Sequence, residues 1–508
     1  MLKNNVRDVY DSLEEKLQDK SRVGAVMGIL HWDQEVIMPK GGANSRARQM
    51  ATLASILHEK STDSELEGML DQLLECPEAQ FNEYEWRNIL EAKRDYDLET
   101  KVPGRLVKEI AELSSKGHSI WAKAREENRF QDFAPTLKRL IELKKEWAAC
   151  VAPEKHPYDA NIDLFERDAT IATILPVFEK LKEELIPLVQ AIAESGKEVD
   201  TSILTGKFPL DRQEALGRKI SEDMGFSFDQ GRMDVSVHPF SGGGDFTDVR
   251  ITTRYGEDNF VESLYAVIHE TGHGLYEQGR MQDWPDLPVS ESLTMGVHES
   301  QSLFWERMIA QGRPFLKYYL PLFTETFPEQ MNGASVDNLY AAINKVSPSF
   351  IRVEADEVTY PLHVILRFEV ERGIFDGSIQ VDDLPQVWNQ KMKEYLGLTP
   401  ETDAEGVLQD VHWSGGAFGY FPSYTLGAMY ACQYFQALKR DIPNIEEQVS
   451  QGKLQPVKEW LNQNIHRRGR LYSAEGLCEK VTGEPLNPEH FISYLKNKYG
   501  ELYEISFS

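Results

Sequence analysis

Cysteine is scarce in this chain of 508 residues. The four cysteines, Cys76, Cys150, Cys432 and Cys478, lie far apart and form no CxxC pair. Their spacing argues against a disulfide framework and against a zinc–thiolate site. It is typical of reduced thiols, and we therefore expect the protein to be cytoplasmic.

Long apolar runs are also missing. No stretch approaches the roughly eighteen apolar residues that a membrane-spanning helix needs. The N-terminal segment, MLKNNVRDVYDSLEEKLQDK, is charged throughout and lacks the apolar centre of a signal peptide. We therefore expect no membrane partner.

The sequence has no run rich in Lys and Arg, and its formal net charge is -27. Phosphate binding needs a basic face, so we do not expect nucleic acid as a partner. Hydrophobic residues make up 41% and charged residues 27% of the chain, which indicates a folded globular protein and not a disordered one.

Helical periodicity dominates the sequence. Residues from about 5 to 150, and the segment 165–195, carry apolar residues at spacings of three and four, the pattern of helices with one buried stripe. No repeat of roughly 20–50 residues and no linker rich in Pro, Gly or Ser divides the chain. We therefore expect residues 1–508 to form a single, mainly α-helical unit.

Residues 230–256 break this pattern. The segments 233–237 (MDVSV) and 249–253 (VRITT) alternate in character and predict two strands of a small antiparallel hairpin or sheet. Glycines 242–244 could suggest a phosphate-binding loop, but no Lys-Ser/Thr pair follows them and no helix starts there. They therefore predict a mobile turn.

The segment His269–His273 (HETGH) is an HExxH motif. Histidines four apart on a helix lie one turn apart on one face, so both imidazoles can bind one metal ion. The surrounding apolar residues form a stripe nearly opposite the histidines: Phe260, Leu264, Val267 and Leu275. We therefore expect a helix that buries this stripe and presents His269 and His273 to a cleft, although a surface helix with two incidental histidines is the alternative.

A hydrolytic zinc site needs a third protein ligand and an open position for water. The segment Ser290–Gln311 predicts a second helix, which carries Glu299 and Glu306 on the side opposite its apolar stripe. Glu299 is the preferred third ligand and Glu306 is the second choice. Either carboxylate could instead be a solvated surface charge.

A metal of this type lowers the pKa of its bound water and polarises a carbonyl group. Glu270 directly follows the first histidine, so it can take a proton from that water and pass it to a leaving amine. The motif therefore predicts amide hydrolysis with Glu270 as the general base.

Over almost its whole length, the chain resembles the carboxypeptidase Taq family of metallocarboxypeptidases. Five motifs in addition to the HExxH carry the resemblance, in chain order: His31–Glu35 (HWDQE) with the following Met-Pro-Lys-Gly-Gly, Asp248–Thr252 (DVRIT), His298–Gln301 (HESQ), Ile351–Asp356 (IRVEAD) and Gly406–Trp413 (GVLQDVHW).

This resemblance implies an enzyme that removes single residues from the C-termini of peptides, with broad side-chain tolerance. It implies a nearly all-helical fold, similar to neurolysin and angiotensin-converting enzymes, with two lobes flanking a deep groove. It also implies zinc or cobalt as the cofactor, Glu299 as the third ligand, and a homodimer.

A carboxypeptidase must recognise a free α-carboxylate, for which arginine is the natural bidentate partner. The family match makes Arg352 the first candidate and Arg250 the second, although a surface salt bridge is the usual role of a single arginine. His412 and a tyrosine in the segment HWSGGAFGYFPSY resemble the residues that stabilise the oxyanion in neurolysin-like enzymes. Tyr424 matches the spacing best, and Tyr420 competes with it.

His238, in the His-Pro-Phe before the glycines, is a further candidate for lining the groove.

Two other functions remain open. An oligoendopeptidase or dipeptidase would share every metal-site residue and differ in whether it binds the substrate's C-terminal carboxylate. A non-catalytic peptide-binding protein could use the metal structurally, but such sites usually close all four positions with Cys and His, and no cysteine lies near 269–299.

Overall fold

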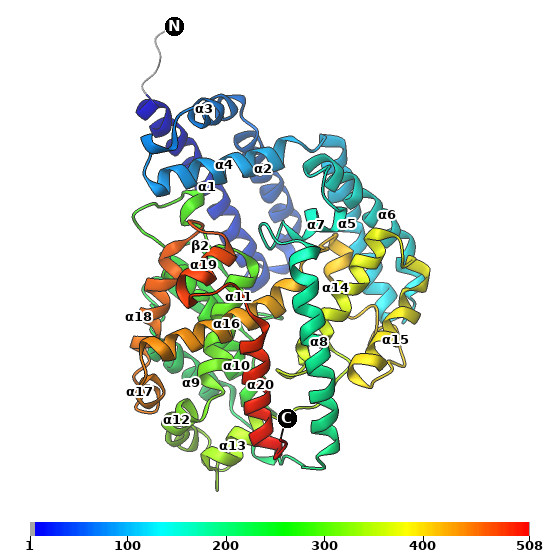
Figure 1. Cartoon of the computed structure of the whole chain (residues 1–508), viewed down its shortest axis with the longest axis vertical. Coiled ribbons are helices and arrows are strands. Elements are labelled where there is room, and N and C mark those ends of the chain that lie inside the picture. The colour runs from blue at the N-terminus through cyan, green and yellow to red at the C-terminus, as the bar shows by residue number, and fades with distance from the viewer. Residues whose placement is uncertain (1–5, 507–508) are drawn as a thin grey trace.

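The structure, a computed structural model, describes residues 6–506 and is almost entirely helical, as the periodicity predicts (Figure 1). The N-terminal helices are α1 (Val6–Val36), α2 (Ala43–Ser61), α3 (Ser64–Leu74), α4 (Glu83–Thr100), α5 (Gly104–Glu126), α6 (Phe130–Val151), α7 (Pro157–Ile162), α8 (Ile171–Glu194) and α9 (Leu210–Met224). Within residues 6–506, no helix is long and apolar enough to cross a membrane.

A small sheet follows α9, and the rest of the described chain is helical again. The strands are β1 (Gly231–Val235), β2 (Ser241–Asp245) and β3 (Asp248–Thr253). The later helices are α10 (Phe260–Gln278), α11 (Met295–Leu303), α12 (Arg313–Thr326), α13 (Val336–Ile343), α14 (Tyr360–Asp376), α15 (Leu384–Leu396), α16 (Pro422–Asp441), α17 (Ile445–Val449), α18 (Gln455–Asn464), α19 (Ala474–Thr482) and α20 (Pro488–Tyr503).

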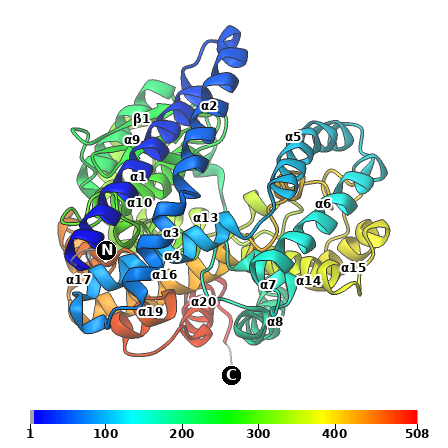
Figure 2. The same cartoon turned by 90° about the horizontal axis from the view of Figure 1, so that it is seen from above.

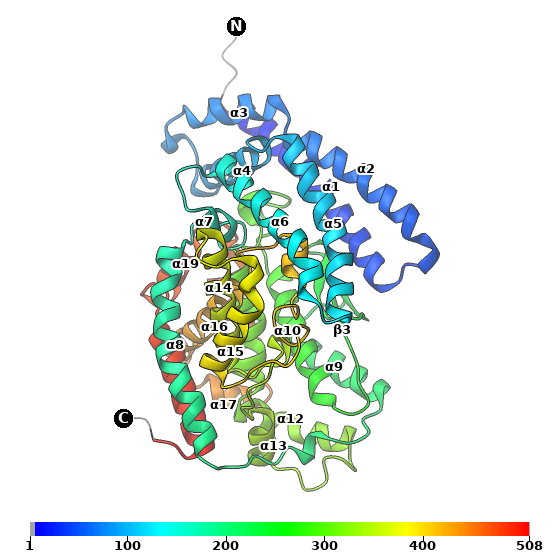
Figure 3. The ribbon, with the colours of Figure 1, turned by 90° about the vertical axis from the view of Figure 1, so that its right-hand side faces the viewer.

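The helices form two groups that diverge from a common base. Figure 2 shows α1, α2, α9 and the sheet on one side and α5, α6, α14 and α15 on the other, with α16 and α20 below. In the second group α5 and α6 pack side by side (Figure 3). The largest cluster of buried apolar side chains extends from Ala124 to Tyr503, and a smaller one joins α1, α3 and α4. In the first group α9 and β3 share the large core with α6, α14 and α15 of the second group, whereas α1 belongs to the smaller cluster.

The sheet differs from the prediction in two ways. The predicted strands β1 and β3 pair in parallel, not as an antiparallel hairpin, with Gly231 opposite Val249. The predicted glycine turn is itself a strand, β2, which pairs antiparallel with the central strand β3. The sheet is therefore mixed, with the order β1-β3-β2, and the tight turn lies at residues 246–247 instead.

The glycines of β2 have a packing role. A Cβ atom added to Gly28 of α1 would lie 2.5 Å from the carbonyl oxygen of Gly243, and one added to Gly244 would lie 2.8 Å from Ile29. Real Cβ atoms do not come this close to a neighbour. The glycines therefore let α1 lie directly on the strand, which explains why a segment typical of turns forms a strand here.

The predicted helix Ser290–Gln311 is shorter at its start and changes type at its end. It begins at Met295, where the side chain of Thr294 accepts a hydrogen bond from the backbone N–H of Val297. After Leu303 it continues as a π-helix over Phe304–Ala310. A π-helix is a rare, wider turn that occurs frequently at functional sites.

Glycines also set the distance between the two helices that carry the predicted ligands. A Cβ atom added to Gly272 of α10 would lie 2.6 Å from the Cα atom of Ser302 on α11. On the other side of α11, a Cβ atom added to Gly427 of α16 would lie 2.8 Å from Cβ of Glu299. Three helices therefore approach one another closely around Glu299.

We predict that Gly272→Ala destabilises the protein, because the new methyl group must push α10 away from α11. The free energy of unfolding should fall by about 1–3 kcal/mol, the usual cost of overpacking a core. Denaturant unfolding followed by circular dichroism measures this. Gly68→Ala on α3, where nothing lies within 4 Å of the added atom, is the control and should be neutral or stabilising; equal stability of the two variants would contradict the prediction.

Candidate metal centre and active site

The predicted ligands converge. His269 and His273 project from adjacent turns of α10, and the Nε2 atoms lie 3.6 Å and 3.5 Å from Oε2 of Glu299 on α11. One donor atom from each of the three residues lies within 4.8 Å of the others. Tetrahedral bonds of about 2.1 Å place two ligands roughly 3.4 Å apart, so this arrangement suits a single ion.

The outer nitrogen of His269 is held by a carboxylate. Its Nδ1 atom lies 2.7 Å from Oε2 of Glu306 on the π-helix. The carboxylate accepts a hydrogen bond from Nδ1–H, so the lone pair of Nε2 is free to face the metal position. Glu306, the second-choice ligand, therefore contacts the ring nitrogen of His269 that is remote from Glu299 and orients the ring.

The outer nitrogen of His273 begins a longer chain of hydrogen bonds. His273 Nδ1 lies 2.7 Å from Nδ1 of His298, and His298 Nε2 lies 2.9 Å from Oε1 of Glu277. Arg280 Nη1 donates to the second oxygen of Glu277 at 2.7 Å. Because Glu277 accepts from His298, the latter can accept from His273, which again leaves the Nε2 lone pair of His273 for an ion.

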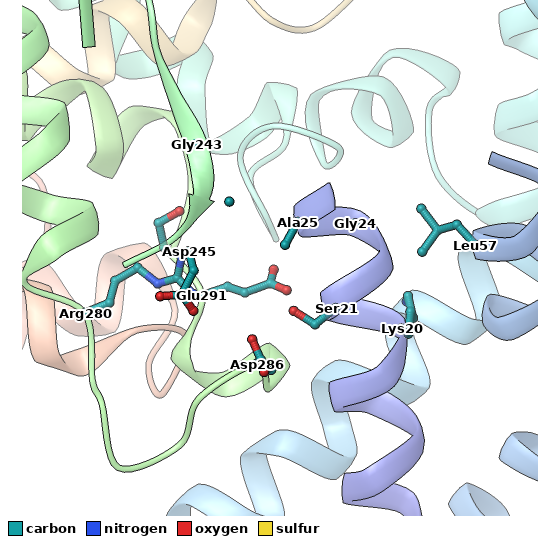
Figure 4. A pocket seen from close by; sticks show the side chains of 12 residues that line it. Lys20, Ser21, Gly24, Ala25, Leu57, Gly243, Asp245, Arg280, Asp286 and Glu291 are labelled. Atoms are coloured by element: carbon teal, nitrogen blue, oxygen red, sulfur yellow. The ribbon is translucent and has the colours of Figure 1, made fainter. Parts of the chain in front are cut away.

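The far end of this chain reaches open space. A cavity of 390 Å³ lies between α1, β2 and the loop after α10, with Asp245, Arg280 and Glu291 pointing into it (Figure 4). A second cavity, of 230 Å³, shares Asp245 and Arg280 and is lined by His298. The outer partners of His273, namely His298, Glu277 and Arg280, therefore line cavities beside the sheet.

Glu270 lies between the two histidines and is 7% exposed. Its Oε2 atom is buried and has no hydrogen-bond partner among residues 6–506. Burial raises the pKa of Glu270 to about 7. The pKa of Glu299 behaves differently: burial raises it, but His269 and His273 outweigh that effect and lower it to about 2. The carboxylate of Glu299 is therefore ionised beside the two histidines, whereas the pKa of the Glu270 carboxyl lies near neutral pH.

Arg352, the first candidate for carboxylate binding, is buried in a polar cluster. Its Nε atom donates to Oδ1 of Asp410 at 3.0 Å, and its Nη1 atom donates to the hydroxyl of Tyr360 at 2.7 Å. Arg367 donates to the other oxygen of Asp410 at 2.6 Å. Two arginines share one carboxylate, so the cluster keeps a net positive charge.

The predicted oxyanion residues lie together. The ring centroids of His412 and Tyr420 are 5.2 Å apart, and those of Tyr420 and Tyr424 are 5.3 Å apart. The guanidinium carbon of Arg352 lies 4.8 Å from the ring centroid of Tyr424. Burial, followed by the charge of Glu299 among the ionised groups, raises the pKa of Tyr420 to about 12. Tyr424 therefore lies against Arg352, and the charge of Glu299 acts on Tyr420.

Arg250 and His238 lie elsewhere. Arg250 donates two hydrogen bonds of 2.7 Å to Asp248 on the same strand and lies 4.7 Å over the ring of Trp32. His238 is exposed in the connection between β1 and β2. Within residues 6–506, neither side chain makes a hydrogen bond or ion pair with His269, His273 or Glu299, and their roles in substrate binding stay predictions.

Comparison with known proteins identifies the family of this chain. The family model of the carboxypeptidase Taq (M32) metallopeptidases matches residues 12–499. Carboxypeptidase 1 of Bacillus subtilis is 40% identical over 483 residues, which cover 95% of this chain and 96% of that protein. The chain belongs to the carboxypeptidase Taq (M32) family.

Other members of the M32 family agree with this assignment. Thermostable carboxypeptidase 1 of Thermus thermophilus is 38% identical over 510 residues, covering 97% of this chain and 99% of that protein. The crystal structure of the M32 carboxypeptidase from Deinococcus radiodurans superposes with a TM-score of 0.95 at 34% identity, covering 98% of this chain and all of that one. The predicted family and helical fold are confirmed, and the protein is a metallocarboxypeptidase, a peptide hydrolase.

Membership of the M32 family implies a metal ion, and the residues fit one. Both histidines have their Nδ1 atoms engaged by outer partners, so two Nε2 atoms and one carboxylate oxygen remain as donors. Glu270 directly follows His269, and its Oε2 atom is buried without a hydrogen-bond partner among residues 6–506. His269, His273 and Glu299 would hold the ion.

Sequence patterns did not reveal three residues near this candidate site. Tyr360 and Glu371 lie on α14, and Arg307 lies on the π-helix. Tyr360 follows Arg352 by eight residues, a spacing that crosses a loop and so gives no periodic signal. Glu371 lies on a helix buried on all sides, where no polar face stands out.

Glu371 fixes the loop that carries His412. It is fully buried and accepts hydrogen bonds from Nε1 of Trp413 at 2.7 Å, the backbone N–H of Gly419 at 2.8 Å and the hydroxyl of Tyr158 at 2.7 Å. One carboxylate thus joins both ends of the segment between His412 and Tyr420.

We predict that Glu371→Gln destabilises the protein and lowers its peptidase activity. In either orientation of the new side-chain amide, its NH₂ group faces an N–H donor, either Nε1 of Trp413 or the backbone N–H of Gly419. One of these buried donors therefore loses its acceptor. The free energy of unfolding should fall by about 1–3 kcal/mol in a denaturant titration. Asp382→Asn, in an exposed ion pair with Lys138, is the matched control and should change by less than about 0.5 kcal/mol.

We also predict that Glu306→Gln weakens metal binding. The amide removes the charge that orients His269 and increases its basicity, and loss of such a partner typically costs roughly 10- to 100-fold in affinity. Competition with a chelator, followed by atomic absorption, measures the affinity. Glu325→Gln, an exposed residue on α12, is the control; unchanged affinity in Glu306→Gln would contradict the role given to Glu306.

Proposed function

We propose that the protein is a zinc-dependent carboxypeptidase that releases single C-terminal amino acids from short or unfolded peptides, with broad side-chain tolerance. One observation carries the proposal: the donor atoms of His269, His273 and Glu299 converge beside a buried Glu270 oxygen that has no partner among the described residues. Two nitrogens and one carboxylate are a donor set typical of catalytic zinc, and cobalt suits the same set.

When bound, the ion lowers the pKa of a water molecule and polarises the scissile carbonyl. Glu270 accepts the proton from the attacking water and then delivers it to the leaving amine. Its placement supports this role, because it is buried and directly follows His269 on α10. A carboxyl with a pKa near 7 can accept and release a proton at neutral pH.

Arg352 binds the substrate's terminal α-carboxylate, and Arg250 remains the second candidate. The net positive charge of the Arg352–Arg367–Asp410 cluster supports Arg352, because an anion neutralises it. His412 and either Tyr424 or Tyr420 donate hydrogen bonds to the oxyanion that forms on the carbonyl. His238 lines the outer groove.

The remaining expectations stay predictions. They are the homodimer, the cytoplasmic location, the organisation of residues 1–508 as a single unit, and the exclusion of nucleic acid and membranes as partners. The net charge of -27 supports the last of these, because phosphate-rich surfaces repel such a protein.

The free C-terminus of the substrate decides between this proposal and an oligoendopeptidase. The metal-reconstituted protein is incubated with an unstructured peptide and with the same peptide amidated at its C-terminus, and products are followed by mass spectrometry. We expect a ladder of single-residue losses from the free peptide only, and none with Glu270→Gln. Internal cuts, or equal cleavage of the amidated peptide, would assign the protein to the endopeptidases.

The variant Arg352→Met tests whether Arg352 binds the α-carboxylate of the substrate. Removal of the guanidinium should lower kcat/KM for the free peptide by roughly 10- to 100-fold, the effect of a lost charge-assisted hydrogen bond. The same measurement of kcat/KM on Arg250→Met, a variant in the sheet, compares the two candidate arginines.

A further inference from the structure

Arg352 lies in a connecting segment, outside the α-helices. It begins a short 3₁₀ turn (Arg352–Glu354) between α13 and α14, and the next side chain, Val353, is 72% exposed. The Nε and Nη1 atoms of Arg352 donate to Asp410 and Tyr360, whereas its Nη2 atom makes no hydrogen bond within residues 6–506. Nη2 is thus the donor left for a substrate, and its position depends on how the main chain of this turn is held.

The side-chain amide of Gln409 holds that main chain. Its oxygen accepts from the backbone N–H of Arg352 at 2.9 Å, and its nitrogen donates to the backbone carbonyl of Phe350 at 3.0 Å. The same nitrogen donates to the backbone carbonyl of Glu405 at 2.8 Å. This pattern requires an amide, because an amide carries an acceptor and two donors, whereas a carboxylate offers acceptors alone. Gln409 thus ties the turn of Arg352 to its own segment of the chain.

Gln409 also contacts the guanidinium group of Arg367 without changing the charge of the cluster. Its oxygen accepts from Nη2 of Arg367 at 2.7 Å. Asp410 pairs with both Arg367 and Arg352, which leaves one positive charge uncompensated. An acidic side chain in place of Gln409 would accept the same bond from Arg367, but it would cancel the charge that attracts an anion.

We propose that Gln409 is a positioning residue for recognition of the substrate's α-carboxylate. It fixes the main chain of Arg352, and as an uncharged acceptor it leaves the cluster of Arg352, Arg367 and Asp410 positive. This inference rests on the carboxypeptidase activity proposed above. It adds a residue that acts through Arg352 to the groups on which binding of a free C-terminus depends.

The variant Gln409→Glu replaces one NH₂ group by an oxygen at nearly constant shape. It adds a charge beside the two arginines and removes the donors to the carbonyls of Phe350 and Glu405. For a peptide with a free C-terminus we expect KM to rise by about 10- to 100-fold and kcat to stay within about threefold, because the α-carboxylate is bound equally in the ground state and the transition state. Gln330→Glu is the matched control, since Gln330 also donates to a backbone carbonyl, that of Lys207 at 2.6 Å, and both constants should be unchanged.

Binding separates this role from a merely structural one. In a Glu270→Gln background loaded with zinc, calorimetry compares an unstructured peptide with the same peptide amidated at its C-terminus. The background protein should bind the free peptide at least about tenfold more tightly, and Gln409→Glu should lower this ratio to within about threefold without weakening binding of the amidated peptide. An equal loss of affinity for both peptides would overturn the inference, because it would assign Gln409 to the general structure of the site.

A second variant keeps the inference testable if Gln409→Glu does not fold, which circular dichroism determines. Gln409→Met retains the length of the side chain and the charge of the cluster but leaves the backbone N–H of Arg352 without its acceptor. We expect KM for the free peptide to rise by about 3- to 10-fold with little change in kcat. An unchanged KM would overturn the inference.

The unmodified enzyme tests the proposed function separately. Equal cleavage of the free and the amidated peptide by this enzyme would contradict the carboxypeptidase proposal. A preference for the free peptide that is the same with and without Gln409→Glu would instead overturn only the inference about Gln409.

Discussion

The close contact between α10 and α11 at Gly272 determines the site. Because the glycine has no side chain, the backbone of α11 reaches α10, and Glu299 comes within 3.6 Å of both ligand histidines. Helices with larger residues at their contact lie about 8–10 Å apart, and one methyl group matters at such a contact. The donor geometry is therefore a property of helix packing, not of the HExxH motif alone.

The π-helix after α11 extends this arrangement. It directs Glu306 to the outer nitrogen of His269 and places Arg307 beside Tyr360. A wider turn of this kind is less stable than an α-helical one and persists where the surrounding packing supports it. Here the neighbouring side chains Phe304 and Trp305 are buried in the main core, which holds the turn in place.

Local patterns predicted the helices and selected three candidate ligands whose donor atoms lie together, because both depend on residues close in sequence. Glu299 was proposed from one helical face and from the family resemblance, and Glu270 from its place in the motif, and their roles stay predictions. The predicted antiparallel arrangement of β1 and β3 was wrong, because the direction of a strand depends on where the chain returns after β2. The β2 glycines were misassigned because their contact with Gly28 of α1 joins segments more than 200 residues apart. Arg307 was missed because an α-helical projection does not describe a π-helix.

Asp410 links residues that are far apart in sequence. Arg352, Arg367 and Asp410 are all buried, and the single carboxylate contacts both guanidinium groups. Replacement of Asp410 alone would leave two like charges facing each other in the interior, and replacement of either arginine would remove the net positive charge of the cluster. A substitution at one of these three positions is therefore tolerated only with a compensating change of charge at another.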